Sequence, residues 1–452
     1  MFVLFDLDGV LVDFRELHKQ SFIQAWNELY PDHSIHEIFH DTMLEARSTK
    51  QKIRILTEHF QIPVSESEVY HKKQYLTQIR LQDEPIYQCV RQTLETLVKK
   101  NIPFACCSNS ILSTIETSLQ RLVPLSSFQF LLSNEDVSHP KPAPDLYLKA
   151  VECSGITNKE DILVFEDSDV GKQAARSAGL HVIDVVDALD ITPLFLDYVL
   201  RHRIRPLMER VNVVIPMAGW GSRFSMEGYT TPKPFLPVHG RPMYETVIRN
   251  IVPSELWDRA SIHLVIRKEH LPLFESQSSS NIHLHLIDHV TEGPACTVLT
   301  LQHMIDSDIP LVIANSDQYL EWNALDFYHT LYHPEWDGVI STFVQPNPED
   351  KKWSYVRLNQ EGEVVEVAEK RVISPLATTG IYGWKRGSDF VRDARKMIEK
   401  EDRVNNEFYV CPVYQYTIQN SNRIRMLLCK KMWGLGVPND YKLFCKEKTL
   451  HP

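Results

Sequence analysis

The sequence contains no apolar run that approaches the roughly eighteen residues needed to cross a bilayer. Its first residues, MFVLFDLDGV, lack the basic segment and long apolar core of a secretory signal and are typical of a short buried strand. The net charge is -11, so the chain also lacks the basic balance typical of proteins that bind nucleic acid or anionic membranes non-specifically. We therefore expect a cytoplasmic protein that binds neither nucleic acid nor membrane. A local basic pocket for phosphates remains compatible with this charge.

None of the 8 cysteines forms a C-x-x-C pair, so neither a zinc site nor a disulfide framework is indicated. The sequence also lacks internal repeats and low-complexity tracts. Hydrophobic residues make up 43% and charged residues 24% of the 452 residues, which is ordinary for a globular protein of two or three domains.

Two segments share the pattern of an apolar strand, a loop rich in Asp, Gly or Ser, and a helix: VLFDLDGVLVD near the N-terminus and VNVVIPMAGWGSRF from Val211. Each is typical of the first β-loop-α unit of an open α/β sheet, where ligands bind beyond the carboxyl ends of the strands. The sequence therefore predicts two Rossmann-like α/β domains in series, over residues 1–207 and 208–452. The amphipathic stretch ALDITPLFLDYVLRHRIRPLMERVN is expected to supply the last helix of the first domain and a short connection.

Within the first domain, residues 16–82 are polar and helically periodic, and no strand candidate interrupts them. We expect a helical cap inserted after the first strand, at about residues 14–85. Strand-like runs return at IPFACCSNS, SFQFLLSN and DILVFEDSD, as a parallel sheet requires.

Asp6 and Asp8 lie two positions apart, directly after the first apolar run. One carboxylate can attack phosphorus while the other donates a proton to the leaving oxygen. Gly9 then lets the backbone turn closely around a bound phosphate.

Further polar residues follow the later strands. Ser108 and Asn109 offer a hydroxyl and an amide to phosphate oxygens, and Lys141 can neutralise charge on the transferring group. Glu166 and Asp167 end an apolar run and supply hard oxygen ligands for Mg²⁺.

In this order, D-x-D-G-V, S-N, K-P and E-D-S-x-x-G-x-x-A-A-x-x-A-G-L resemble the haloacid dehalogenase-like superfamily, over roughly residues 1–195. The helical insert resembles the cap of its β-phosphoglucomutase-like branch. The resemblance implies a catalytic nucleophile at Asp6 and an acid/base at Asp8. It further implies a site for phosphate and Mg²⁺, with phosphate bound by Ser108, Asn109 and Lys141 and the metal among Asp6, Asp8 and Asp167.

Hydrolysis and phosphoryl mutation both remain open for this domain. Phe14 stands where mutases tend to have a small hydroxyl residue, which favours a phosphatase, and His18 falls where some relatives carry a cap-side histidine. The basic cap residues could meet an anionic substrate or simply form a solvated helix face: Arg47, Lys50, Lys52 and Arg54.

The second domain opens with VNVVIPMAGWGSRFSMEGYTTPKPFLP. Gly219 and Gly221 permit a tight loop whose N–H groups point at a triphosphate. Arg223 and Lys233 add positive charge where pyrophosphate must leave. Asp317, after an apolar strand, and Asp440, near the end of the chain, could converge on one Mg²⁺.

These residues resemble the sugar-1-phosphate nucleotidyltransferase family, over about residues 211–444. The resemblance implies catalytic roles for Arg223 and Lys233, and metal ligation by Asp317 and Asp440. It implies nucleotide binding by Ala218, Gly219, Gly221, Arg223, Lys233 and Gly293. Acceptor contacts are expected from Glu369, Lys370, Glu407 and Tyr409, the last two in a segment that resembles a subgroup linked to capsule and lipopolysaccharide genes.

We therefore predict a bifunctional enzyme of surface-glycan precursor synthesis, with one Mg²⁺ in each active site. The second domain would transfer a nucleotidyl group from a nucleoside triphosphate to a sugar or polyol phosphate and release pyrophosphate. Resemblance to choline-phosphate and polyol-phosphate cytidylyltransferases makes CTP the first expectation for the base. The first domain would hydrolyse a phosphate monoester through an aspartyl-phosphate.

Several alternatives stay open. The first domain could be a phosphomutase that supplies a sugar 1-phosphate, or it could trim a bisphosphate or act on a branch intermediate. One domain could be a non-catalytic binding or regulatory module. A GT-A glycosyltransferase would also place Asp after a strand, but it has no need for Arg223 and the P-K-P segment. The acceptor, the base, any channelling between the sites and the formation of homo-oligomers are not determined by the sequence.

Overall fold

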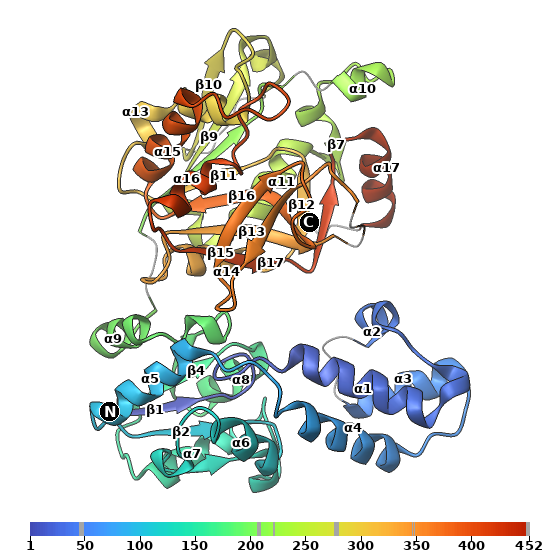
Figure 1. The fold of residues 1–452 in the computed structure, drawn as a ribbon, viewed down its shortest axis with the longest axis vertical. Coiled ribbons are helices and arrows are strands. Elements are labelled where there is room, and N and C mark those ends of the chain that lie inside the picture. Colours follow the sequence, from blue (N-terminus) through green and yellow to red (C-terminus); the bar gives the residue numbers. More distant parts are fainter. Residues whose placement is uncertain are drawn as a thin grey trace. The chain divides into compact units, whose positions relative to one another are not determined.

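A computed structural model describes residues 1–44, 49–205, 209–219, 222–274, 280–345, 347 and 349–448. The chain divides into two compact units, residues 1–205 and 206–452. Both units are α/β folds (Figure 1), which confirms the predicted fold class. Within the described residues, no helix is long and apolar enough to cross a membrane.

The first unit is built on a five-stranded parallel sheet in the order β3-β2-β1-β4-β5. Its strands are β1 (Phe2–Phe5), β2 (Phe104–Cys107), β3 (Leu131–Leu132), β4 (Ile162–Glu166) and β5 (His181–Asp184). All residues of β1, β2 and β4 are buried, because helices cover the sheet on both faces. These helices are α5 (Gln88–Lys99), α6 (Leu112–Leu119), α7 (Asp145–Ser154), α8 (Asp169–Ser177) and α9 (Pro193–His202).

A helical cap is inserted in the first unit between β1 and α5 (Figure 1). It consists of α1 (Arg15–Leu29), α2 (Glu37–Met43), α3 (Thr49–Phe60) and α4 (Glu66–Arg80). Trp26, Leu56 and Val69 belong to its separate apolar core, distinct from the two clusters that flank the sheet. The cap therefore has its own packing, which holds α1, α3 and α4 together above the carboxyl ends of the strands.

The second unit is built on a nine-stranded mixed sheet whose main path is β10-β9-β6-β11-β16-β13-β17. The strands are β6 (Val211–Pro216), β9 (Ala260–Arg267), β10 (Ile282–Ile287), β11 (Leu311–Ala314), β13 (Gly338–Val344), β14 (Ser354–Leu358), β15 (Val364–Glu369), β16 (Leu376–Trp384) and β17 (Ile424–Leu428). β10, β9, β6 and β11 run parallel, whereas β16 is antiparallel to β11 and β13. The parallel half therefore gathers its loops at one edge.

Two small antiparallel pairs complete the strands: β7 (Pro237–Val238) with β8 (Arg241–Pro242), and β12 (Gln318–Glu321) with β18 (Lys431–Gly434). The helices are α10 (Ser222–Met226), α11 (Met243–Ile251), α12 (Pro294–Leu299), α13 (Gln302–Ile305), α14 (Ala324–Leu331), α15 (Gly387–Glu399), α16 (Val413–Gln419) and α17 (Pro438–Glu447).

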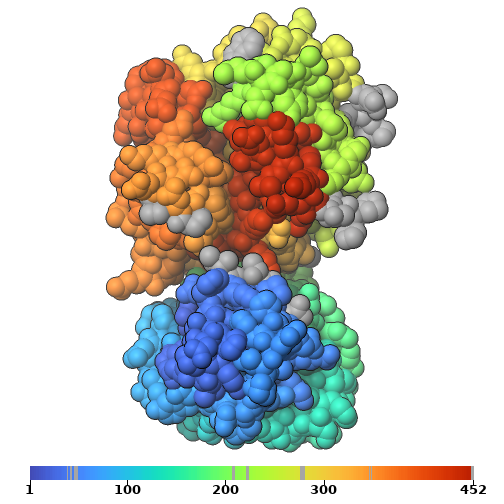
Figure 2. Space-filling model, turned by 90° about the vertical axis from the view of Figure 1, so that its right-hand side faces the viewer, coloured from blue at the N-terminus to red at the C-terminus, as the bar shows by residue number. Residues whose placement is uncertain are grey.

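The C-terminal helix α17 packs against the segment that follows β6, as Figure 2 shows for the red and green surfaces of this unit. The Tyr441 hydroxyl donates a hydrogen bond of 2.6 Å to the Pro237 carbonyl, and its ring lies 6.0 Å from that of Phe224. The end of the chain is thus part of the same region as the loop after the first strand.

Candidate functional site

The first cluster of polar residues lies at the carboxyl ends of β1, β2 and β4. β1 is the central strand, and Phe5 is in register with Cys106 on one side and Phe165 on the other. Asp6, the next residue after β1, donates its backbone N–H to the carbonyl of Phe165. The parallel register therefore brings together side chains as far apart in the sequence as Asp6 and Asp167.

Lys141 contacts two carboxylates and a backbone carbonyl at the centre of this cluster. Its Nζ atom lies 2.7 Å from Oδ1 of Asp6, 2.5 Å from Oε1 of Glu166 and 2.9 Å from the Cys107 carbonyl oxygen. The ammonium group thus donates in three directions, and its side chain is only 3% exposed. Burial alone would lower the pKa of Lys141, but the two carboxylates raise it above its ordinary value, so the residue stays positively charged.

Asn109 fixes the position of Lys141 through the backbone. Its amide Nδ2 donates to the Lys141 carbonyl at 3.1 Å, and its Oδ1 accepts from the Lys141 N–H at 3.0 Å. Ser108 is buried, and its Oγ atom accepts from the backbone of Ser110. Both predicted phosphate-binding residues therefore lie beside Lys141.

Asp6, Glu166 and Asp167 form a cluster of carboxylates whose nearest oxygens all lie within 4.8 Å of one another. Burial and the neighbouring Glu166 raise the pKa of Asp6 and of Asp167 to about 7. Glu166 already accepts hydrogen bonds from Lys141 and from the Tyr147 hydroxyl. By contrast, Oδ1 of Asp167 is buried and has no hydrogen-bond partner among the described residues.

The Asp8 side chain lies apart from these three carboxylates. Its Oδ1 accepts a 2.7 Å hydrogen bond from the backbone N–H of Phe14, and it is not part of the three-carboxylate cluster found among the described residues. Burial raises its pKa to about 7. The side chain can therefore hold or release a proton near neutral pH, as a general acid/base must.

Gly9 accounts for the close approach of the first loop to Asp167. Its φ of +84° is in the left-handed region, and a Cβ atom there would lie 2.0 Å from Oδ2 of Asp167. Both conditions require glycine at this position.

A second cluster lies in the second unit, after β6. Ala218 is buried, Gly219 is exposed with open space around it, and the Arg223 side chain is exposed. Gly221 lies outside the described residues, as does Arg47 of the cap. Met217 donates its N–H to the Val265 carbonyl, so the loop starts beside the end of β9.

Lys233 and Asp317 are in direct contact in this unit. The Lys233 Nζ atom lies 2.7 Å from Oδ2 of Asp317. A Cβ atom on Gly436 would lie 2.7 Å from the same oxygen, and one on Gly434 would lie 3.5 Å from Oδ2 of Asp440. The segment 434–436 thus lies against both predicted metal carboxylates.

The predicted acceptor residues form a third group. The Lys370 Nζ atom lies 2.5 Å from the Tyr409 hydroxyl, which in turn lies 2.5 Å from Oε2 of Glu407. Glu369 accepts a hydrogen bond from the Ser354 hydroxyl, and burial raises the pKa of its carboxyl. All four predicted residues are therefore connected or adjacent, at the end of β15 and in the segment before α16.

The backbone conformation and close packing at Gly293 leave no room for a side chain. Its φ is +131°, and a Cβ atom there would lie 2.5 Å from the backbone N of Phe408. It is the residue before α12 and lies directly against the chain that carries Glu407 and Tyr409. Its predicted role in nucleotide binding stays a prediction.

Residues 3–185 match the family of haloacid dehalogenase-like hydrolases, and residues 212–434 match the nucleotidyl transferase family. The first region is 30% identical over 192 residues to the protein named probable pseudouridine-5'-phosphatase of Drosophila melanogaster, which covers 41% of this chain and 80% of the relative. The chain joins a haloacid dehalogenase-like hydrolase domain to a nucleotidyl transferase domain.

Two further similarities concern one domain each. The hydrolase domain is 28% identical over 193 residues to the phosphorylated carbohydrates phosphatase of Thermotoga maritima, covering 42% of this chain and 86% of the relative. The transferase domain is similar to the crystal structure of a nucleoside-diphosphate-sugar pyrophosphorylase from Vibrio cholerae RC9, with 24% identity and a TM-score of 0.46 over 52% of this chain and all of the other.

Both domains offer residues that fit a divalent cation. In the hydrolase domain, the unpartnered Oδ1 of Asp167 and the mutual repulsion of the buried carboxylates fit a cation held by Asp6 and Asp167. In the transferase domain, the Asp317 carboxylate packs so closely on Gly436 that a Cβ atom there would collide with it, and the Asp440 carboxylate lies beside Gly434 of the same short segment. A magnesium ion bound at either site would supply charge neutralisation for a phosphoryl group.

Sequence reasoning missed the pair formed by His18 and Lys73 in the hydrolase domain. Lys73 Nζ lies 3.1 Å from His18 Nδ1; Lys73 is buried and His18 is half-buried. Burial, with the charges of Lys73 and Lys52, lowers the pKa of His18 to about 3, so the ring is neutral and accepts from the lysine. The residues are 55 positions apart on α1 and α4, so no local pattern could have paired them.

Proposed function

We propose that the chain is a bifunctional enzyme of surface-glycan precursor synthesis. The hydrolase domain would release phosphate from a monoester, and the transferase domain would couple a nucleoside triphosphate to a sugar or polyol phosphate. The observation that supports the proposal is that in each domain a motif lysine contacts a motif aspartate. Lys141 binds Asp6 at 2.7 Å in the first domain, and Lys233 binds Asp317 at 2.7 Å in the second.

In the hydrolase domain, Asp6 is proposed to attack phosphorus while the ester P–O bond breaks. Asp8 would donate its proton to the departing oxygen, which a pKa raised to about 7 allows near neutral pH. Water would then attack the aspartyl-phosphate, with Asp8 taking up its proton, and inorganic phosphate would leave. Lys141, held in place by Asn109, would stabilise the negative charge on the phosphoryl oxygens together with Ser108.

In the transferase domain, an oxygen of the acceptor phosphate would attack the α-phosphorus of the nucleoside triphosphate, and pyrophosphate would leave. Arg223 and Lys233 would stabilise the leaving group, and the loop with Ala218, Gly219 and Gly221 would bind the triphosphate. The acceptor would contact the group of Glu369, Lys370, Glu407 and Tyr409, with Gly293 close to the nucleotide. We propose CTP as the nucleotidyl donor, because the sequence resembles polyol-phosphate cytidylyltransferases.

The name of the Thermotoga maritima relative, phosphorylated carbohydrates phosphatase, supports phosphorylated carbohydrates as the substrate class of the first domain. The eight free cysteines, scattered over the two domains, support a reducing cytoplasm. Mg²⁺ is the proposed cofactor at both sites, with Asp6 and Asp167 at the first and Asp317 and Asp440 at the second. Asp8, which lies outside the three-carboxylate cluster of the described residues, is kept as the acid/base and not as a ligand.

The proposal is tested by incubating the full chain with each of the four nucleoside triphosphates, Mg²⁺ and a panel of sugar and polyol phosphates. We expect pyrophosphate with CTP and one acceptor class, inorganic phosphate from a monoester, and loss of both products in EDTA. Isomerisation of a sugar phosphate without phosphate release would instead indicate a phosphomutase. Absence of either product with every pair would favour a binding or regulatory role for that domain.

A further inference from the structure

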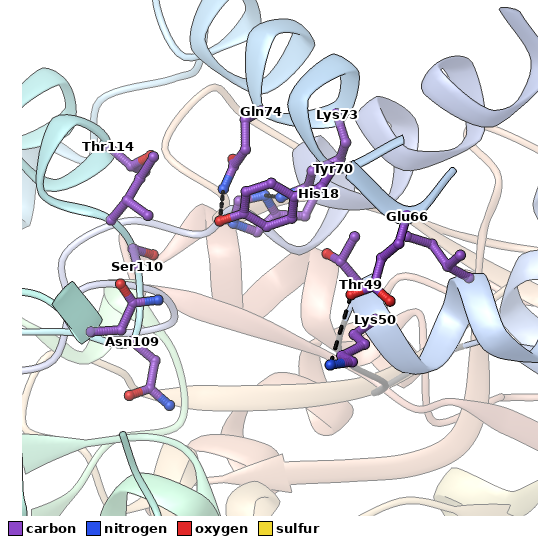
Figure 3. A pocket seen from close by; sticks show the side chains of 13 residues that line it. His18, Thr49, Lys50, Glu66, Tyr70, Lys73, Gln74, Asn109, Ser110 and Thr114 are labelled. Atoms are coloured by element: carbon purple, nitrogen blue, oxygen red, sulfur yellow. Dashed lines mark hydrogen bonds and ion pairs between the residues drawn. The ribbon is translucent and has the colours of Figure 1, made fainter. Parts of the chain in front are cut away.

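A polar cavity of about 420 Å³ lies in the hydrolase domain between the cap and the sheet (Figure 3). Its walls come from α1, α3 and α4 of the cap, and from the segments after β2 and β3. This volume falls within the range of roughly 300–1,000 Å³ typical of small-molecule sites. The cavity is therefore large enough for a substrate whose phosphoryl group reaches the carboxylate cluster.

One end of the cavity adjoins the reacting groups. Asn109 and His18 both line it, and Asn109 holds the backbone of Lys141, which binds Asp6. Lys73 lies at this end, with its Nζ atom 3.1 Å from Nδ1 of His18. His18 donates its backbone N–H to the carbonyl of Phe14, and the N–H of Phe14 in turn donates to Asp8. The single buried cation of the described lining is therefore close to the groups that handle the first phosphoryl group.

At the cap end of the cavity, the described lining residues carry no excess positive charge. Lys50 of α3 is 3.9 Å from Glu66 of α4, so the cation at this end is matched by a carboxylate (Figure 3). Nearby, the Gln74 amide donates a 3.1 Å hydrogen bond to the Tyr70 hydroxyl. Hydroxyl and amide groups complete this part of the wall, and such groups hydrogen-bond to uncharged hydroxyls.

We infer that the hydrolase domain acts on the monophosphate of an uncharged polyhydroxylated molecule, a sugar or polyol, and that Glu66 selects against a second phosphate. A second phosphate at the cap end would meet the Glu66 carboxylate, whereas hydroxyl groups would find donors and acceptors on Tyr70 and Gln74. A phosphomutase passes through a bisphosphate, so the same charge distribution favours hydrolysis. The inference rests on the proposed phosphatase activity.

The experiment compares kcat/KM for fructose 1-phosphate and fructose 1,6-bisphosphate, with glucitol 6-phosphate as a polyol, by release of inorganic phosphate from the full chain. We expect the wild type to prefer the monophosphate at least about tenfold, as repulsion between like charges at a binding site would produce. Glu66→Gln should reduce this preference about three- to fivefold, because the ion pair is solvent-exposed. Glu68→Gln, an exposed position on the same helix outside the cavity, should leave it unchanged.

A wild-type preference for the bisphosphate, or equal effects of Glu66→Gln and Glu68→Gln on the ratio, would overturn the inference. Asp6→Asn separates this failure from failure of the proposed function. If Asp6→Asn abolishes phosphate release while the bisphosphate is preferred, only the inference fails. If the Asp6→Asn protein releases phosphate like the wild type, the proposed phosphatase mechanism fails and the inference falls with it.

Discussion

The ammonium group of Lys233 lies 2.7 Å from a carboxylate oxygen of Asp317, although the two residues are 84 positions apart. The contact joins the loop after β6 to the segment between β11 and β12. It places the cation proposed to stabilise the leaving pyrophosphate beside a carboxylate proposed to hold the metal. Binding of a metal and a triphosphate would give each residue a new partner of opposite charge.

Replacing Lys233 should therefore affect one activity only. We expect Lys233→Ala to lower the rate of pyrophosphate release by a factor of about 10² to 10³, the usual loss when a group that stabilises a developing anion is removed. Release of inorganic phosphate by the hydrolase domain should stay at the wild-type rate. Lys352→Ala, which removes an exposed lysine near Asp350, is the matched control and should change neither rate.

Replacing Lys141 should damage both stability and activity of the hydrolase domain. Lys141→Met leaves Asp6 and Glu166 buried without their cation, which we expect to cost about 3 kcal/mol of folding free energy. Hydrogen exchange of peptides from β1, β2 and β4 reports this loss separately from the transferase domain. Lys149→Met removes a half-exposed ion pair with Asp136 and should cost less than about 1 kcal/mol. Equal hydrogen-exchange rates for these peptides in the two variants would contradict the stabilising role of Lys141.

Adding one methyl group at Gly9 should disturb the metal site. Gly9→Ala would push against Oδ2 of Asp167 and also strain a backbone with φ of +84°. We expect a rise of at least about tenfold in the Mg²⁺ concentration that gives half-maximal phosphate release. Gly155→Ala is matched in its positive φ of +66° but meets no atom within 4 Å. It should lower stability by about 1 kcal/mol and leave the magnesium dependence unchanged.

The sequence predicts residues that stand at strand ends within motifs, because a parallel sheet brings those ends to one edge. Asp6 and Asp167 are examples, and the structure places them together. Lys141 comes instead from the K-P motif before α7, and Asn109 holds its backbone in place. The contacts of Glu166 with Lys141 and Tyr147 could not be predicted in this way, since they depend on side-chain packing between distant elements. The same holds for the His18–Lys73 pair, which joins two helices of the cap. In the transferase domain, the packing of Gly293 on Phe408 gives the glycine a structural reason that its motif did not indicate.

The stability of the transferase domain should depend on pH through His263 on β9. Its Nδ1 atom lies 3.0 Å from Nε2 of His285, and burial together with His285 and His283 lowers its pKa to about 4. The folded pKa lies below that of the unfolded chain, so the unfolded state binds the proton more readily. Stability is therefore full above about pH 6.5 and is lost as the pH falls from about 6.5 to about 4.

The expected loss over this interval is between about 1 and 3 kcal/mol. It can be followed by urea unfolding with tryptophan fluorescence, because Trp26 is the single one of the 8 tryptophans within residues 1–205. His263→Gln should show a smaller decline between pH 6.5 and 4 than the wild type. His289→Gln, at an exposed histidine, should follow the wild-type curve. If His263→Gln shows the same decline in stability as the wild type, His263 is not the source of the pH dependence.

We propose that the chain holds two independent active sites, one in each domain. The most direct test measures inorganic phosphate and pyrophosphate in parallel for the wild type, Asp6→Asn and Asp317→Ala, with Mg²⁺ and the substrates that the panel identifies. We predict that Asp6→Asn loses phosphate release and keeps pyrophosphate release, and that Asp317→Ala does the reverse. Loss of both products in either folded variant, or loss of neither in both, would contradict the account.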